Sequence, residues 1–182
     1  MLRRIRSLFG QATTLLLVAV GLSVMPGAAS PASALSGSQF DPGLIIADTV
    51  FYDFTTMTVD QIQNFLNSQV PNCKANYGET PCLKDYHTDT PAKPGEDGKC
   101  TALDAKTDQT SAMIIHDIAV ACHINPRVLL VTLQKEQGLV QATNPTPYMY
   151  RAALGYGCPD SDPAICGKVW SGLFNQLYKA AG

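Results

Sequence analysis

The sequence predicts a mainly α-helical domain with little β structure. Several segments repeat apolar residues at the spacing of one helix face. Most of these segments begin at a capping residue or at an Asx-Pro or Thr-Pro pair, which are typical helix starts. Six cysteines indicate that disulfides hold the long loops between the helices.

The N-terminus has the pattern of a secretory signal peptide over residues 1–34. Arg3, Arg4 and Arg6 precede the apolar run LLLVAV, and Ala32-Ser33-Ala34 forms a small-residue cleavage site, with the cut after Ala34. The apolar run is short for a membrane span, which needs about 20 residues; an uncleaved anchor is the alternative. We therefore expect a secreted or cell-wall-associated protein with no stable membrane association after cleavage.

The charge balance excludes a basic nucleic-acid-binding surface. The chain has 13 Lys and Arg against 15 Asp and Glu, a net charge of −2. Loss of the three arginines of the signal peptide leaves 10 against 15, a net charge of −5. Any binding to an anionic polymer must therefore come from a shaped groove rather than from charge attraction.

After the leader, residues 35–57 are predicted to be an extended N-terminal segment, and residues 58–182 a single domain. Residues 44–54 are apolar and partly β-branched, which favours a short strand or an extended segment. A capping box at Thr58 and Gln61 begins a helix that ends at Pro71. Residues 71–107 are rich in Pro, Gly and Cys and predict a loop insert. A flap that contacts substrate is the alternative for this insert, with candidates Tyr77, Tyr86 and His87.

Four further helix starts follow the insert. Residues 110–123 place apolar side chains on one face. Asn125-Pro126 begins the next helix, which ends at Gly138. Thr146-Pro147 and Asp162-Pro163 mark two later starts. The last helix carries a strong apolar stripe, formed by Val169, Trp170, Leu173, Phe174, Leu177 and Tyr178.

The six cysteines allow many disulfide connectivities, and the sequence does not choose among them. The simplest set joins the close pairs Cys73/Cys82 and Cys158/Cys166, which leaves Cys100/Cys122. No C-x-x-C pair is present, and the three histidines lack zinc-finger spacing, so no metal is expected. No glycine-rich phosphate loop is present either, and no cofactor is expected.

Glu136 is the candidate catalytic residue. The helix around it is apolar nearly all round, which predicts the central, buried helix of the domain. On a helical wheel Glu136 lies close to Leu129 and Leu133, so an apolar wall would remove water from its carboxyl group. Burial and the negative end of the helix dipole both favour the protonated form, which a general acid requires. Alternatively, Glu136 extends past the helix end or pairs with one of three cations, Arg127, Arg151 or Lys168.

The segments LLVTLQKEQGLV, GYGCPD and WSGLFNQLY resemble the lysozyme-like superfamily. They are closest to exported actinobacterial proteins similar to lytic transglycosylases, which also share MTVDQIQNFLNSQVPNC and CLKDY. The resemblance implies a lysozyme-like helical domain with Glu136 as general acid/base. Tyrosine faces suit sugar rings, and glycines allow close backbone approach. The residues expected to bind substrate are Gln137, Tyr148, Tyr150, Gly155, Tyr156, Gly157 and Asp160. Core packing is the alternative for each tyrosine.

The resemblance implies a monomer that cleaves the glycan strands of peptidoglycan. Glu136 would protonate the glycosidic oxygen between N-acetylmuramic acid and N-acetylglucosamine. It would then accept a proton from the muramic C6 hydroxyl, which yields a 1,6-anhydro product and needs only one carboxyl group. Hydrolysis would need a second carboxylate. One alternative is a non-catalytic wall-binding or adhesin module, and another is a secreted structural or partner-binding domain.

Overall fold

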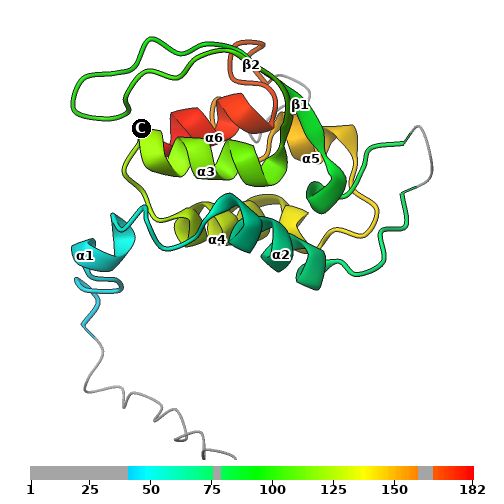
Figure 1. Cartoon of the computed structure of the whole chain (residues 1–182), viewed down its shortest axis with the longest axis horizontal. Coiled ribbons are helices and arrows are strands. Elements are labelled where there is room, and N and C mark those ends of the chain that lie inside the picture. Colours follow the sequence, from blue (N-terminus) through cyan, green and yellow to red (C-terminus); the bar gives the residue numbers. More distant parts are fainter. Residues whose placement is uncertain (1–40, 76–78, 160–165) are drawn as a thin grey trace, which may run out of the picture. The chain divides into compact units, whose positions relative to one another are not determined.

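Helix α3 (Ser111–Ala121) lies at the centre of the fold, between α6 (Leu173–Ala181) on one side and α4 (Pro126–Gln137) with α2 (Val59–Gln69) on the other (Figure 1). The computed structural model describes residues 41–75, 79–159 and 166–182. The predicted signal peptide, Tyr77, Asp160 and the helix start at Asp162-Pro163 lie outside these residues. The chain is mainly helical, as predicted, with one two-stranded sheet in its described part.

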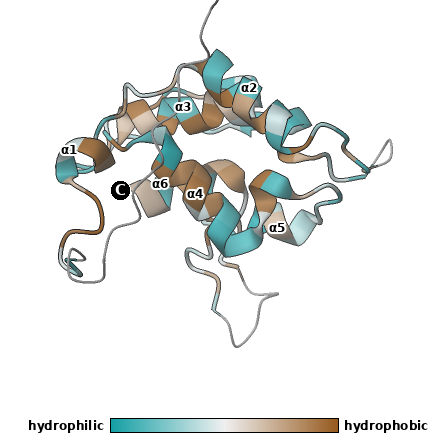
Figure 2. Cartoon of the chain, turned by 90° about the horizontal axis from the view of Figure 1, so that it is seen from below, coloured by the Kyte–Doolittle hydropathy of each residue, from teal (hydrophilic) through white to brown (hydrophobic). Residues whose placement is uncertain are grey.

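The prediction that α4 is the central helix is wrong. In α3, seven residues are buried: Ser111, Ala112, Ile114, Ile115, Ile118, Ala119 and Ala121. The small alanines of α3 let other helices approach it closely from both sides. Helix α4 buries Leu129, Leu130 and Leu133 but leaves Val131 67% exposed. In Figure 2, α2 and α4 accordingly carry both apolar (brown) and polar (teal) residues.

The helix boundaries predicted from capping residues are confirmed. The Thr58 hydroxyl accepts a hydrogen bond from the Gln61 backbone N–H, and the Gln61 side chain accepts one from the Thr58 N–H, at 3.3 and 2.9 Å. Asn125 caps α4 by accepting from the Arg127 N–H at 2.9 Å. Gly138 ends α4 in the left-handed conformation, with φ of 63°. These signals are local, so they can be recognised without knowledge of the tertiary structure.

Two segments differ from the expectation. Residues 44–54 form no strand; they contain the short helix α1 (Asp48–Phe51). The insert 71–107 is not all loop: it holds the 3₁₀ turn η2 (Leu83–Asp85) and strand β1 (His87–Thr90), which pairs antiparallel with β2 (Lys106–Thr110). Two isolated bridges, Lys93 with Leu103 and Glu96 with Cys100, continue this hairpin. The insert is therefore an extended hairpin with its own backbone pairing.

The C-terminal third also differs in detail. A 3₁₀ turn, η3 (Leu139–Gln141), follows α4, and α5 (Pro147–Arg151) is shorter than the predicted run to Gly155. Val169 and Trp170, expected on the last helix, lie before its start. Val169 is 66% exposed, so it takes no part in the apolar stripe. No helix in the described residues is long and apolar enough to span a membrane.

Three disulfides connect the loops to the helical core. The bridges are Cys73–Cys82, Cys100–Cys122 and Cys158–Cys166, so the simplest pairing is confirmed. Three bridges are typical of a chain that folds in an oxidising compartment. The Cys100–Cys122 bridge joins the hairpin insert to the C-terminal end of α3.

Two lysines hold the insert against α6. Lys93 Nζ donates to Asn175 Oδ1 at 2.8 Å and lies over two aromatic rings of α6. Burial lowers the pKa of Lys93, and the nearby Lys179 lowers it further. Lys179 binds Glu96 of the insert, and this hydrogen bond raises the pKa of the lysine. Ionic contacts therefore add to the Cys100–Cys122 bridge in fixing the insert.

Asn125 is expected to contribute more to stability than an ordinary helix cap. Its Oδ1 accepts from the Arg127 N–H and the Thr56 hydroxyl, and its Nδ2 donates to the Val50 carbonyl at 2.9 Å. Because the side chain is buried, Asn125→Ala should lower the free energy of unfolding by about 2–3 kcal/mol. Thr58→Ala, which removes only an exposed cap, should cost about 1 kcal/mol. Urea unfolding measures both, and equal small losses would contradict the tethering role of Asn125.

Candidate functional site

Glu136 lies at the exposed C-terminal end of α4. Its side chain is 35% exposed, and its Oε1 lies 2.7 Å from Lys135 Nζ. The carboxylate therefore has an ammonium group and solvent beside it, where the sequence predicted an apolar wall. The cation that it pairs with is its chain neighbour rather than Arg127, Arg151 or Lys168. Glu136 is accessible to a large substrate, but it does not line the cavities around α5 and α6.

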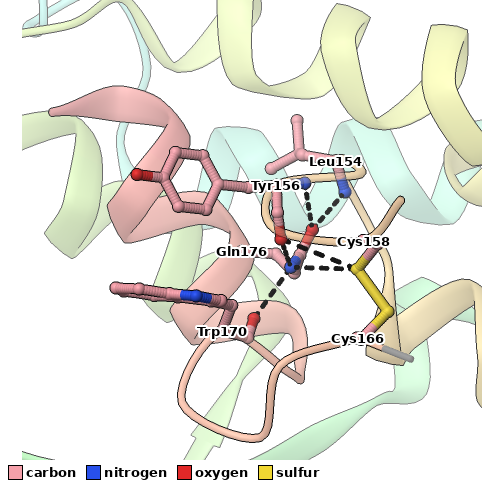
Figure 3. The surroundings of a disulfide bond; sticks show 6 residues. All are labelled: Leu154, Tyr156, Cys158, Cys166, Trp170 and Gln176. Atoms are coloured by element: carbon pink, nitrogen blue, oxygen red, sulfur yellow. Dashed lines mark hydrogen bonds between the residues drawn. A yellow bond between two sulfur atoms is a disulfide. The ribbon is translucent and has the colours of Figure 1, made fainter. Parts of the chain in front are cut away.

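The predicted substrate-lining turn is a rigid structure. Gly155 and Gly157 have φ values of 74° and 65°, a conformation that favours glycine. Tyr156 lies between them and is 42% exposed. The Cys158–Cys166 disulfide closes the loop that follows the turn (Figure 3). The backbone therefore presents one aromatic ring at the surface from a fixed position.

Gln176 of α6 is the main support of this turn. Its Oε1 accepts from the backbone N–H groups of Leu154 and Tyr156, at 3.1 and 3.0 Å. Its Nε2 donates to the carbonyl oxygens of Tyr156 and Trp170, at 2.7 and 2.8 Å (Figure 3). Gln176 is fully buried. One side-chain amide thus satisfies three backbone groups of the turn and the Trp170 carbonyl just before α6.

Sequence reasoning missed Gln176, although a signal was present. The residue interrupts the apolar stripe of the last helix, on the same face as Leu173 and Leu177. A polar residue on a buried helix face must find hydrogen-bond partners inside the protein. The pattern could therefore have indicated a buried amide. Its partners in the turn could not be predicted, because Leu154 and Tyr156 lie 22 and 20 residues earlier in the chain.

Trp170 packs into a space left by two glycines. A Cβ atom at Gly157 would lie 2.4 Å from the indole Cδ1, and one at Gly167 would lie 2.9 Å from it. The ring of Tyr156 meets Trp170 in a T-shaped contact, with centroids 5.5 Å apart. Lys179 Nζ lies 5.3 Å from the centre of the Trp170 ring. We call Tyr156, Trp170 and Lys179 the aromatic corner.

The other predicted binding residues lie elsewhere. Tyr150 is buried and stacks on Tyr86 with centroids 4.1 Å apart, and its hydroxyl donates to the Pro81 carbonyl. Burial raises the pKa of both tyrosines. Tyr148 is half-buried beneath the Arg151 guanidinium. Gln137 is half-buried at the end of α4. Core packing is thus the role of Tyr150, and of the three tyrosines predicted to bind substrate Tyr156 is the exposed one.

The described residues offer no metal site. No group of three or more His, Cys, Asp or Glu residues among them could hold an ion. The six cysteines are all in disulfides. The aromatic corner offers two aromatic rings and one ammonium group, which is bound by the Glu96 carboxylate.

Gln176→Glu should make stability depend on pH. The new carboxylate would face the carbonyl oxygens of Tyr156 and Trp170, to which Nε2 now donates. The pKa of this buried carboxyl should rise well above about 4.3, so the folded state binds its proton more tightly than the unfolded state. Below pH ~4 the protonated carboxyl donates only one of the two hydrogen bonds that Nε2 now makes, so the variant should be about 1 kcal/mol less stable than wild type there. It should lose about 3 kcal/mol more as the pH rises to neutral.

Thermal unfolding across this pH range tests the prediction. Gln61→Glu is a matched control, because a capping box accepts Glu as readily as Gln. A Gln176→Glu variant whose unfolding follows that of Gln61→Glu at every pH would show that the amide does not support the turn.

The resemblance to the lysozyme-like superfamily remains a prediction from sequence motifs, and the function has to be argued from the site itself. Comparison of the chain with protein-family models, with curated proteins and with solved structures finds no match.

Proposed function

We propose that this protein is an exported domain that binds the glycan strands of peptidoglycan and that the aromatic corner contacts the sugar. The observation that carries the proposal is the exposed ring of Tyr156, which a fully buried glutamine and a disulfide hold in place. Aromatic rings offer a flat apolar face with a polar tip, which matches the faces and hydroxyls of a pyranose. A site that is already rigid loses less entropy when a ligand binds.

Polar groups at the corner support a sugar ligand. Lys179 lies over the Trp170 ring and is a hydrogen-bond donor, and its partner Glu96 is an acceptor. Their charges neutralise each other, and the mature chain is acidic overall. Attraction to an anionic polymer therefore contributes little, and binding should depend on shape and hydrogen bonds. We expect it to be nearly independent of salt.

Tyr156→Ala should weaken binding to purified peptidoglycan about tenfold, because it removes the exposed stacking face. Tyr52→Ala is a matched control. Tyr52 is also an exposed tyrosine, at 56%, but it lies at the C-terminal end of α1. Sedimentation with insoluble cell walls measures both variants. Equal binding by wild type and Tyr156→Ala, or no binding by wild type, would overturn the proposal.

A second candidate function is cleavage of the same strands by Glu136. Its exposure at the end of α4 favours this candidate, since a polymer can reach the carboxyl group. In this reaction Glu136 would protonate the glycosidic oxygen as its bond to the muramic C1 breaks. The resulting carboxylate would then take the proton of the muramic C6 hydroxyl as that oxygen bonds to C1. The carboxyl group would have to exchange its contact with Lys135 for one with the substrate.

Glu136→Gln separates cleavage from binding. If Glu136 is the acid, wild type clears a suspension of purified cell walls and the variant does not, while Asp97→Asn, at an exposed carboxylate of the insert, clears normally. Mass spectrometry of the fragments would then distinguish anhydro from reducing ends. Equal clearing by wild type and Glu136→Gln would show that Glu136 does not take part in the reaction. Wall binding by both proteins without clearing by either would support binding as the only function.

The Glu136→Gln variant should keep its free energy of unfolding within about 0.5 kcal/mol of wild type, because exposed ion pairs contribute little.

A further inference from the structure

A long surface groove lies between residues 79–91 and the helices α5 and α6. It consists of three cavities of about 360, 490 and 220 Å³. The first two share Thr80 and Pro147 in their lining, and the second and third share Tyr86, Ser171 and Gly172. Because neighbouring cavities share walls, they form one elongated groove rather than three separate hollows.

The groove is formed by parts of the chain that are fixed to one another. At its base, Tyr86 stacks on Tyr150, whose hydroxyl donates to the Pro81 carbonyl at 2.7 Å. On the opposite wall, the Gly172 N–H donates to the Arg151 carbonyl at 3.1 Å, which joins the start of α6 to α5. The walls are therefore preformed, as in most small-molecule sites.

The lining of the groove suits a carbohydrate better than an extended peptide. Four of its residues are prolines, which have no backbone N–H and so cannot pair with an added strand: Pro81, Pro91, Pro145 and Pro147. Proline rings and the Tyr86 ring supply apolar faces instead. Side chains supply the polar groups, with hydroxyls from Thr80, Thr88 and Ser171 and a guanidinium from Arg151. Flat apolar surface with side-chain donors and acceptors matches a pyranose chain.

We infer that this groove is a second sugar-binding region and that the ligand is a glycan chain of several sugars rather than one terminal sugar. The inference rests on the proposed function. Ser171 in the groove wall directly follows Trp170 of the aromatic corner, so the backbone of the groove wall continues into the corner. A chain that occupies both must be several sugars long. Affinity should therefore rise with the length of the glycan.

Binding of short and long β-1,4-linked N-acetylglucosamine oligomers to the intact protein tests the inference by calorimetry. Arg151→Gln removes the guanidinium from the groove, and Ser171→Trp fills the groove where two cavities meet. Each should weaken binding of the long oligomers about tenfold and leave the shortest ones unchanged. Arg127→Gln is the matched control, because Arg127 is exposed and lines a separate apolar cavity between α2 and α4. Melting curves establish that each variant is folded.

Several outcomes would overturn the inference. One is an affinity that does not rise with oligomer length; another is full binding of long oligomers by both folded groove variants. Displacement of the long oligomer by an extended peptide that binds more tightly would assign the groove to a peptide. If wild type binds sugar and only Tyr156→Ala weakens it, the groove inference fails while the proposed function stands. If wild type binds neither oligomers nor cell walls, the proposed function itself fails.

Discussion

The buried amide of Gln176 is the interaction on which the surface site depends. A turn with two left-handed glycines turns several backbone groups inward, where water does not reach them. Without a partner, each such group would destabilise the fold by about 1–3 kcal/mol. Gln176 of α6 accepts from two N–H groups of the turn and donates to its Tyr156 carbonyl, and its second donor binds the Trp170 carbonyl just before α6. The position of Tyr156 at the surface follows from this arrangement.

Features fixed by neighbouring residues could be predicted from the sequence. The capping box at Thr58, the Asn125-Pro126 helix start and the end of α4 at Gly138 each depend on residues a few positions apart. The disulfides between close cysteines are local in the same sense. The mainly α-helical class follows from these elements, because each helix is recognisable by itself.

Features that depend on distant residues could not be predicted. The apolar α4 has the pattern of a central helix, yet the small residues of α3 give that helix the central position. The surroundings of Glu136 depend on which face of α4 meets α3, and a helical wheel does not contain this information. Trp170 has the spacing of the last helix, but its indole needs the space beside Gly157, across the disulfide loop. The glycine-containing turn could thus be recognised from the sequence, while its support by Gln176 and the ring of Trp170 beside it could not.

The fit of the Trp170 indole against the backbone also limits how this protein can evolve. Gly157 is constrained twice, because its backbone is left-handed and because a Cβ atom there would collide with the Trp170 indole. Gly167 has no such conformational requirement; its lack of a side chain matters because the indole occupies the space. Positions 167 and 170 should therefore change together among descendants of this chain. An alanine at 167 is compatible with a smaller ring at 170, and a tryptophan at 170 requires the glycine.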